Sequence, residues 1–230
     1  MSNTLCNILV PVDFTTKNKW AITKAIEMAN QMDCNIHLVN IVQSGWVSSF
    51  TPYESHVDRM NSYDQLKDLA VSYSNQLCGN GKIEISLLEG NPLNKLTEYI
   101  RDFEMDMVVM GLSGNLLQRV ISSTSINKIS RITNVPVLAV GSKGLVHHFK
   151  KIISEGLDIV HSVSTTPVHG MILEGDNLAK TTIDFAKRIN GDLIMINPVE
   201  EFKLPGWWNK LTNKLLSYGS GIPVMTMSKQ

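Results

Sequence analysis

The chain has 230 residues and 43% hydrophobic content, enough for one large domain or two small ones with an apolar core. Its 21 basic residues balance 21 acidic ones, so no net charge attracts nucleic acid or an anionic membrane. No apolar run reaches the roughly 18 to 20 residues that span a bilayer, and no secretory leader opens the sequence, so we expect a cytoplasmic protein.

The first 140 or so residues alternate short apolar runs with helical patterns, which is typical of βαβ units and a parallel sheet. Strands are expected near Asn7–Val12, Asn35–Val42, Lys82–Leu88, Met107–Met110 and Asn134–Val140. Helices are expected near Asn18–Met32, Val57–Cys78 and Pro92–Phe103, with a loop over 43–57. A further helix precedes the last strand and is predicted to be capped by Thr124 or Ser125.

The three cysteines, Cys6, Cys34 and Cys78, are scattered and lack C-x-x-C spacing. An odd number of cysteines argues against a disulfide framework, and the spacing argues against a structural zinc site. We therefore expect reduced thiols that serve mainly as packing residues.

The fourth strand runs directly into a glycine-spaced loop. Gly111 and Gly114 follow the apolar run Met107–Met110, at a point where the backbone has to turn sharply and approach a ligand closely. The helix after the loop aims free backbone N–H groups and its positive end at the same point. The pattern predicts an anion site, and phosphate is a suitable ligand.

This loop resembles the nucleotide loop of the universal stress protein family, in which G-x-x-G is followed by a Gly-Ser or Gly-Thr pair. Gly111, Ser113 and Gly114 match the first part and Ser125 matches the hydroxyl position, while Thr124 replaces the third glycine. The segment 134–140 (NVPVLAV) matches the last strand of the family, and 7–13 (NILVPVD) matches its first strand.

The resemblance implies a doubly wound α/β fold with a parallel five-stranded sheet in the order 3-2-1-4-5, similar to the adenine-nucleotide α-hydrolases. It also implies ATP as ligand, together with Mg²⁺. By this resemblance, Val12, Asp13 and Val39 contact the nucleoside. The predicted phosphate contacts are Gly111, Ser113, Gly114, Thr124 and Ser125. Asp13 has an alternative interpretation as the N-cap of the helix that starts near Thr15 or Thr16.

The last ninety or so residues contain a partial repeat of the first domain. The segment 87–111 aligns with 172–197, and Val135-Pro136-Val137 matches Ile222-Pro223-Val224. We therefore predict a complete domain over 1–142 and a truncated second copy over 143–230, which begins with a helix over 146–160 and lacks the first strand, first helix and second strand.

The second copy is not expected to bind nucleotide, because its loop reads Asn197-Pro198-Val199-Glu200-Glu201 and places two acids where phosphate would approach. Since family members pair through their last strands, 135–140 and 222–227 are predicted to pair antiparallel within one chain. This pairing would cover an exposed sheet edge. A further contact between two copies of the chain, forming a homodimer, would close the remaining apolar surface.

Three classes of function are compatible with the sequence. The first is a stress-response protein that binds an adenine nucleotide and acts through regulation. The second is a nucleotide-free interaction scaffold in which Thr124 closes the phosphate site. The third is an enzyme, and we predict against it, because the residues after the first strand read Asp13-Phe14-Thr15-Thr16-Lys17 rather than the S-G-G-x-D-S loop of the related pyrophosphatases.

Overall fold

The structure is a computed structural model of the chain, and it describes residues 6–42, 52–111, 123–141, 152–155, 168–170, 178–196, 215 and 221–226. The chain divides into two compact units, Met1–Met110 and Gly111–Gln230. The domain boundary at residue 142 comes from the sequence repeat rather than from contacts, and it stays a prediction.

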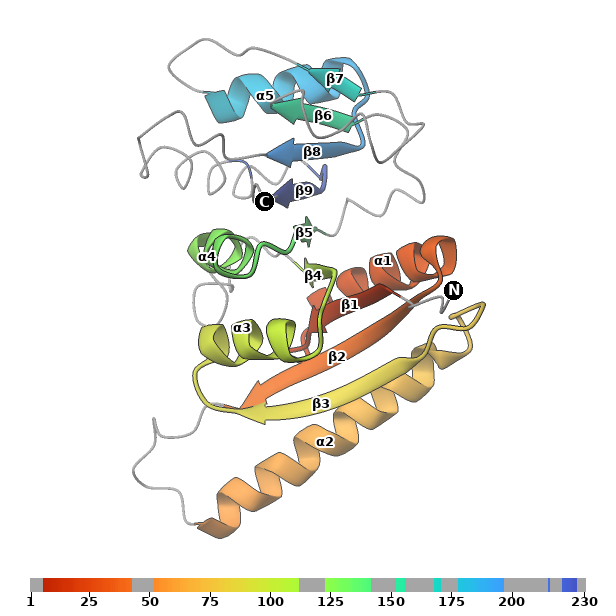
Figure 1. Cartoon of the computed structure of the whole chain (residues 1–230), viewed down its shortest axis with the longest axis vertical. Helices are drawn as coiled ribbons and strands as arrows, with labels where there is room; N and C mark the ends of the chain where they lie inside the picture. Colours follow the sequence, from red (N-terminus) through yellow and green to blue (C-terminus); the bar gives the residue numbers. More distant parts are fainter. Residues whose placement is uncertain are drawn as a thin grey trace. The chain divides into compact units, whose positions relative to one another are not determined.

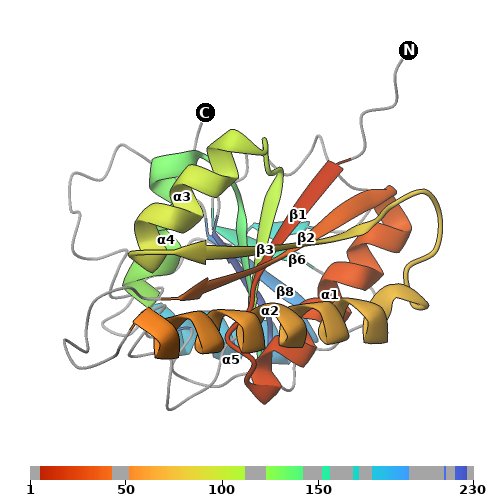
Figure 2. The same ribbon diagram turned by 90° about the horizontal axis from the view of Figure 1, so that it is seen from below.

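The first unit contains a parallel sheet in the order β3-β2-β1-β4. Its strands are β1 (Cys6–Pro11), β2 (Cys34–Val42), β3 (Ile83–Glu89) and β4 (Met107–Gly111). The helices are α1 (Thr16–Met32), α2 (Pro52–Ser74) and α3 (Pro92–Asp102). Figure 2 shows α1 and α2 on one face of β1 to β3 and α3 on the other face. The α/β class and the predicted strand order 3-2-1-4-5 are confirmed.

Helices on both faces explain why the central strands are apolar without alternation. Ile8, Leu9 and Val10 of β1 are completely buried. Helix α1 covers one face with apolar residues at helical spacing, namely Ala21, Ile22, Ala25, Ile26 and Ala29. None of the helices in the described parts of the chain is long and apolar enough to cross a membrane.

Helix α2 differs from its predicted bounds at both ends. It begins at Pro52 rather than Val57, because the fixed φ of proline suits the first helical turn. It ends at Ser74 rather than Cys78. The hydroxyls of Ser72 and Ser74 donate to the carbonyls of Leu69 and Val71, and such local bonds compete with helix propagation.

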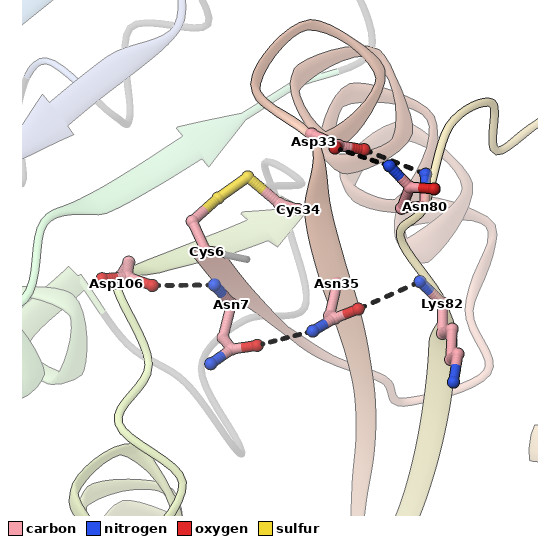
Figure 3. Close-up of a disulfide and its surroundings, with 8 residues drawn as sticks. All are labelled: Cys6, Asn7, Asp33, Cys34, Asn35, Asn80, Lys82 and Asp106. Carbon is pink, nitrogen blue, oxygen red and sulfur yellow. Dashed lines mark hydrogen bonds between the residues drawn. A yellow bond between two sulfur atoms is a disulfide. The ribbon is translucent and has the colours of Figure 1, made fainter. Parts of the chain in front are cut away.

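The prediction that all three cysteines are reduced is wrong for two of them, because Cys6 and Cys34 form a disulfide (Figure 3). In the parallel register of β1 and β2 these residues are direct partners, with their Cα atoms 4.5 Å apart. This spacing lies within the range that a disulfide spans. Cys78 is a free, exposed thiol.

The second unit contains a sheet in the order β5-β9-β8-β6-β7. Its elements are α4 (Ser123–Thr133), β5 (Val137–Val140), β6 (Ile152–Glu155), β7 (Val168–Gly170), α5 (Leu178–Arg188), β8 (Leu193–Ile196) and β9 (Val224–Thr226) (Figure 1). The predicted antiparallel pairing of the last strands is confirmed, since β5 pairs with β9 from Val137↔Thr226 to Ala139↔Val224. The other pairs are parallel.

The core of the second unit is formed by α5 together with strands β8 and β9. Ala179, Ile183 and Ala186 of this helix cluster with apolar residues of β8 and β9, which are Ile194, Ile196 and Val224, and with Leu215. All seven residues are at most 4% exposed. The cluster supplies the burial that helix and strands of this length need for stability.

The helix predicted over 146–160 is wrong at 152–155, which form strand β6. Strand β6 pairs in parallel with both β7 and β8. Two consecutive isoleucines, Ile152 and Ile153, favour an extended backbone because branching at Cβ restricts their χ1 angles in a helix. Strand β6 lies between β7 and β8, as β1 lies between β2 and β4 in the first unit.

Candidate functional site

The carboxyl ends of β1 and β2 are joined by hydrogen bonds at the predicted nucleoside site. The Val12 N–H donates to the Val39 carbonyl at 2.8 Å, and the Asn40 Nδ2 donates to the Val12 carbonyl at 2.7 Å. The side chains of Val12 and Val39 are buried, at 4% and 1% exposure. Their contact with a nucleoside stays a prediction, and it would involve their backbone edge more than their side chains.

Asp13 is exposed immediately after this junction. Its Oδ1 accepts hydrogen bonds from the Thr15 N–H at 3.0 Å and from the Thr15 hydroxyl at 2.6 Å. This turn holds Phe14 at a φ of 57°, a left-handed conformation that is unusual for a bulky residue. The N-cap of α1 is Thr15, so the alternative interpretation of Asp13 as the helix cap is wrong. The carboxylate instead shapes the turn between β1 and α1.

Two buried asparagines support this turn, and sequence reasoning missed both of them. The Asn18 Oδ1 accepts from the Asp13 N–H at 2.9 Å, while its Nδ2 donates to the Pro11 carbonyl at 3.1 Å. Asn40 holds Val12 in the same way from β2. The signal for Asn40 was available, because an amide inside the apolar run IHLVNIV requires a buried hydrogen-bond partner.

The residues predicted to bind phosphate lie at and beyond the end of β4. Gly111 is the last residue of β4 and begins the second unit, while Ser113 and Gly114 lie outside the described residues. Helix α4 begins at Ser123, so Thr124 and Ser125 belong to its first turn. Neither residue is the cap that the sequence predicted, because both already have helical backbone.

The position of Thr124 bears directly on the scaffold alternative. A β-branched residue is strained in a left-handed conformation, which a glycine adopts freely. Thr124 lies inside α4, and residues of an α-helix have negative φ. The replacement of glycine by threonine therefore creates no backbone strain at this position.

The described site residues are suited to binding a neutral hydroxylated group. A carboxylate accepts hydrogen bonds and donates none, so Asp13 is suited to the hydroxyls of a sugar. The side chain is anchored through Oδ1 and stands at the edge of the sheet where ligands of open α/β folds bind. Within the described residues, no group of three or more His, Cys, Asp and Glu side chains is arranged to hold a metal ion.

A second polar cluster lies on the face of the sheet that α3 covers. The His37 Nδ1 lies 3.0 Å from the Tyr99 hydroxyl, which lies 3.0 Å from the Ser86 hydroxyl. The ring of Phe103 stacks on Tyr99 with centroids 4.2 Å apart. Burial lowers the pKa of His37 and raises that of Tyr99, while the Glu84 carboxylate, 3.7 Å from His37, partly opposes the lowering. The cluster connects β2, β3 and α3.

A shallow pocket of about 350 Å³ lies between α2 and β3. It is lined by Arg59, Met60, Tyr63, Asp64 and Leu87. An exposed ion pair between Arg59 and Glu89, at 3.2 Å, borders the same region. None of the lining residues belongs to the predicted nucleotide site, so the pocket is separate from it.

A model of the universal stress protein family matches residues 6–141 of this chain. The chain is also 27% identical over 148 residues to a Staphylococcus saprophyticus protein assigned to the same family, an alignment covering 63% of this chain and 88% of the relative. A Staphylococcus epidermidis relative is 26% identical over 148 residues, with coverage of 63% and 89%. The matched region contains every residue of the predicted site.

Solved structures of the family resemble this one. A universal stress protein from Archaeoglobus fulgidus is 12% identical and superposes with a TM-score of 0.68, covering 97% of this chain and 96% of its own. A family protein from Arabidopsis thaliana, solved with AMP bound, is 18% identical with a TM-score of 0.42, covering 59% of this chain and 91% of its own. The first comparison supports the fold along almost the whole chain.

Replacing Asn40 by alanine tests the junction at the end of β1. The change removes the donor to the buried Val12 carbonyl, so we expect the free energy of unfolding to fall by about 1–3 kcal/mol. Urea denaturation measures this loss. Asn94→Ala, on the exposed surface of α3, is the matched control and should change stability by about 0.5 kcal/mol or less. Equal effects of the two substitutions would contradict the assigned role of Asn40.

The buried imidazole of His37 predicts a loss of stability in mild acid. Because the pKa of His37 is lowered in the folded protein, the unfolded chain binds more protons below the ordinary histidine pKa of about 6.5. Stability from this residue is therefore complete above that pH and decreases as the pH falls below it. Urea denaturation at several pH values should show a weaker decrease in His37→Gln, and an unchanged pH dependence would contradict this assignment.

Proposed function

We propose a function from one premise: this chain belongs to the universal stress protein family. Its role is to bind an adenine nucleotide, ATP, through the predicted domain 1–142 and to act in the stress response through regulation rather than catalysis. Its location is the cytoplasm. The observation that carries the proposal is the exposed, anchored carboxylate of Asp13 at the carboxyl end of β1.

The nucleoside part of the proposal rests on the chemistry of the β1 end. A ribose offers vicinal hydroxyl donors, and the Asp13 carboxylate is a strong acceptor at the sheet edge where such ligands bind. The bonds from Thr15 and Asn18 fix the carboxylate and the adjoining backbone before any ligand arrives. A preorganised acceptor costs less entropy on binding than one that has to be ordered.

The phosphate part of the proposal assigns the anion to the segment between β4 and α4. Gly111, Ser113 and Gly114 would supply backbone N–H groups, and Thr124 and Ser125 would supply the N-terminal turn of α4. The helical backbone at Thr124 is compatible with this role. Mg²⁺ would be held mainly by the phosphates and water, which is its usual mode in nucleotide sites.

A regulatory role fits the partners of Asp13. Among the described residues, Asp13 is hydrogen-bonded to Thr15 and Asn18, and neither of these side chains is a general base at neutral pH. Asp13 is assigned to the sugar end of the nucleotide, away from the γ-phosphate that hydrolysis would attack. This arrangement supports binding without turnover.

We also propose that 143–230 is a truncated second copy of the first domain. The order β9-β8-β6-β7 supports it, because β6 takes the position of a first strand and β7 aligns in sequence with the start of β3. In this interpretation the second copy lacks the first helix, the second strand and the second helix of the complete domain. Strand β6 corresponds to the first strand, which the sequence predicted to be absent. One nucleotide per chain is expected.

A homodimer would have to use a surface other than the free edge of β5, because β9 of the same chain already pairs with that edge. We propose that two copies associate through another face of the molecule. Light scattering of the purified chain at micromolar concentration should give twice the mass of one chain. The mass of a single chain would contradict the proposed dimer while leaving the nucleotide proposal intact.

Calorimetric titration with ATP and Mg²⁺ tests the proposed function. The natural chain should bind one nucleotide. Asp13→Asn should weaken binding about tenfold to hundredfold, because it removes the charge of the acceptor while its remaining Oδ1 still bonds Thr15. Asp68→Ala, an exposed carboxylate on α2, is the matched control and should bind like the natural chain.

Two further outcomes decide between this function and the scaffold alternative. If the natural chain binds no nucleotide and Thr124→Gly does, then Thr124 closes the site and the chain is a scaffold. If neither binds while circular dichroism shows both folded, the nucleotide proposal is wrong. Unchanged affinity in Asp13→Asn would contradict the assignment of this residue.

A further inference from the structure

The disulfide between Cys6 and Cys34 lies at the amino ends of β1 and β2, opposite to the end that carries Asp13. The two cysteines are 28 residues apart in sequence, and the whole of α1 lies between them. Parallel strand pairing therefore brings together two thiols that the sequence keeps far apart. The bond joins neighbouring strands at the centre of the first unit.

The two sulfurs differ in their access to solvent. Cys34 is completely buried, whereas Cys6 is partly exposed. A small reagent in solution can reach Cys6 first, and Cys34 is then the neighbouring thiol that completes the reaction. This division of roles between an accessible and a resolving cysteine is typical of redox-sensing pairs.

Hydrogen bonds hold the surrounding strand ends independently of the disulfide (Figure 3). The Asn7 N–H donates to Asp106 at 2.7 Å, the Asn35 Nδ2 donates to the Asn7 Oδ1 at 3.1 Å, and the Lys82 N–H donates to the Asn35 Oδ1 at 3.1 Å. These bonds tie the amino ends of β4, β1, β2 and β3 together. The two thiols would therefore remain opposite each other after reduction, ready to be oxidised again.

We propose that Cys6 and Cys34 form a redox-modification site, a dithiol that small-molecule disulfides oxidise reversibly to the observed bond. The inference goes beyond nucleotide binding and takes from the proposed function only the cytoplasmic location. In that compartment thiols are mostly reduced, and disulfides that do form are usually redox-sensing or catalytic.

The chemistry is two successive thiol–disulfide exchanges with oxidised glutathione. The Cys6 thiolate attacks one glutathione sulfur, forms a mixed disulfide and releases one glutathione thiolate. The Cys34 thiolate then attacks the Cys6 Sγ and releases the second. The two cysteines lose two electrons and two protons, while one glutathione disulfide is reduced to two thiols.

The test uses the full chain in a Cys78→Ser background, which removes the exposed third thiol. The folded protein is equilibrated in glutathione buffers of graded redox potential, and thiol exchange is then quenched with acid. The free thiols are alkylated and counted by mass spectrometry. We expect both thiols to be lost together under oxidising conditions and both to return under reducing conditions. The oxidised protein should melt about 5–15 °C higher than the reduced one, because the bond closes a long loop in the unfolded chain.

Single substitutions separate the roles of the two cysteines. In Cys34→Ser the remaining Cys6 should stop at the mixed disulfide with glutathione, and the melting temperature should no longer depend on the redox buffer. Cys6→Ser should leave a buried Cys34 that reacts only when the protein is unfolded.

Two results would overturn the proposal. Retention of both thiols in the folded chain under oxidised glutathione would show that the site does not form. A bond that forms but is reduced only after unfolding would be structural rather than a switch. Neither result depends on ATP binding, so failure of the redox site and failure of the nucleotide site are distinguishable.

Discussion

The parallel pairing of β1 with β2 is the interaction on which the rest of the first unit depends. Its register runs from Cys6↔Cys34 to Pro11↔Val39, and it fixes both ends of the sheet at once. At one end it brings two cysteines within bonding distance, and at the other the Val12 N–H, next to Asp13, donates to the Val39 carbonyl of β2. A slip of one residue in this register would turn every apolar side chain of β1 to the opposite face of the sheet. It would also separate Cys6 from Cys34 and Val12 from Val39.

Short amide side chains complete the pairing where the ladder of backbone hydrogen bonds ends. Asn18 and Asn40 satisfy the carbonyls of Pro11 and Val12 at the carboxyl end, and Asn7 and Asn35 form a chain of bonds at the amino end. Each asparagine provides a donor and an acceptor on a short, stiff stem, so it bonds a strand end at a small entropic cost. These residues extend the hydrogen bonding of the pair beyond the backbone ladder at both ends.

The sequence predicted what depends on local pattern and failed where the result depends on long-range pairing. Apolar runs and glycine positions located most of the strands and helices of the first unit. The match of Val135-Pro136-Val137 with Ile222-Pro223-Val224, together with the pairing of last strands in the family that the sequence resembles, predicted the pairing of β5 with β9. The disulfide was missed, because only the parallel register shows that Cys6 faces Cys34. Strand β6 was missed because four residues carry too little periodicity to distinguish a strand from a helix.

The pairing of β5 with β9 also has a consequence for assembly. An unpaired edge strand is a template for another chain, and an antiparallel partner from the same chain removes it. In the described part of the second unit, Ala179, Ile183 and Ala186 give α5 the apolar face that packs against β8 and β9. The covering of the β5 edge therefore depends on the packing of α5 against β8 and β9, which holds β9 in the sheet.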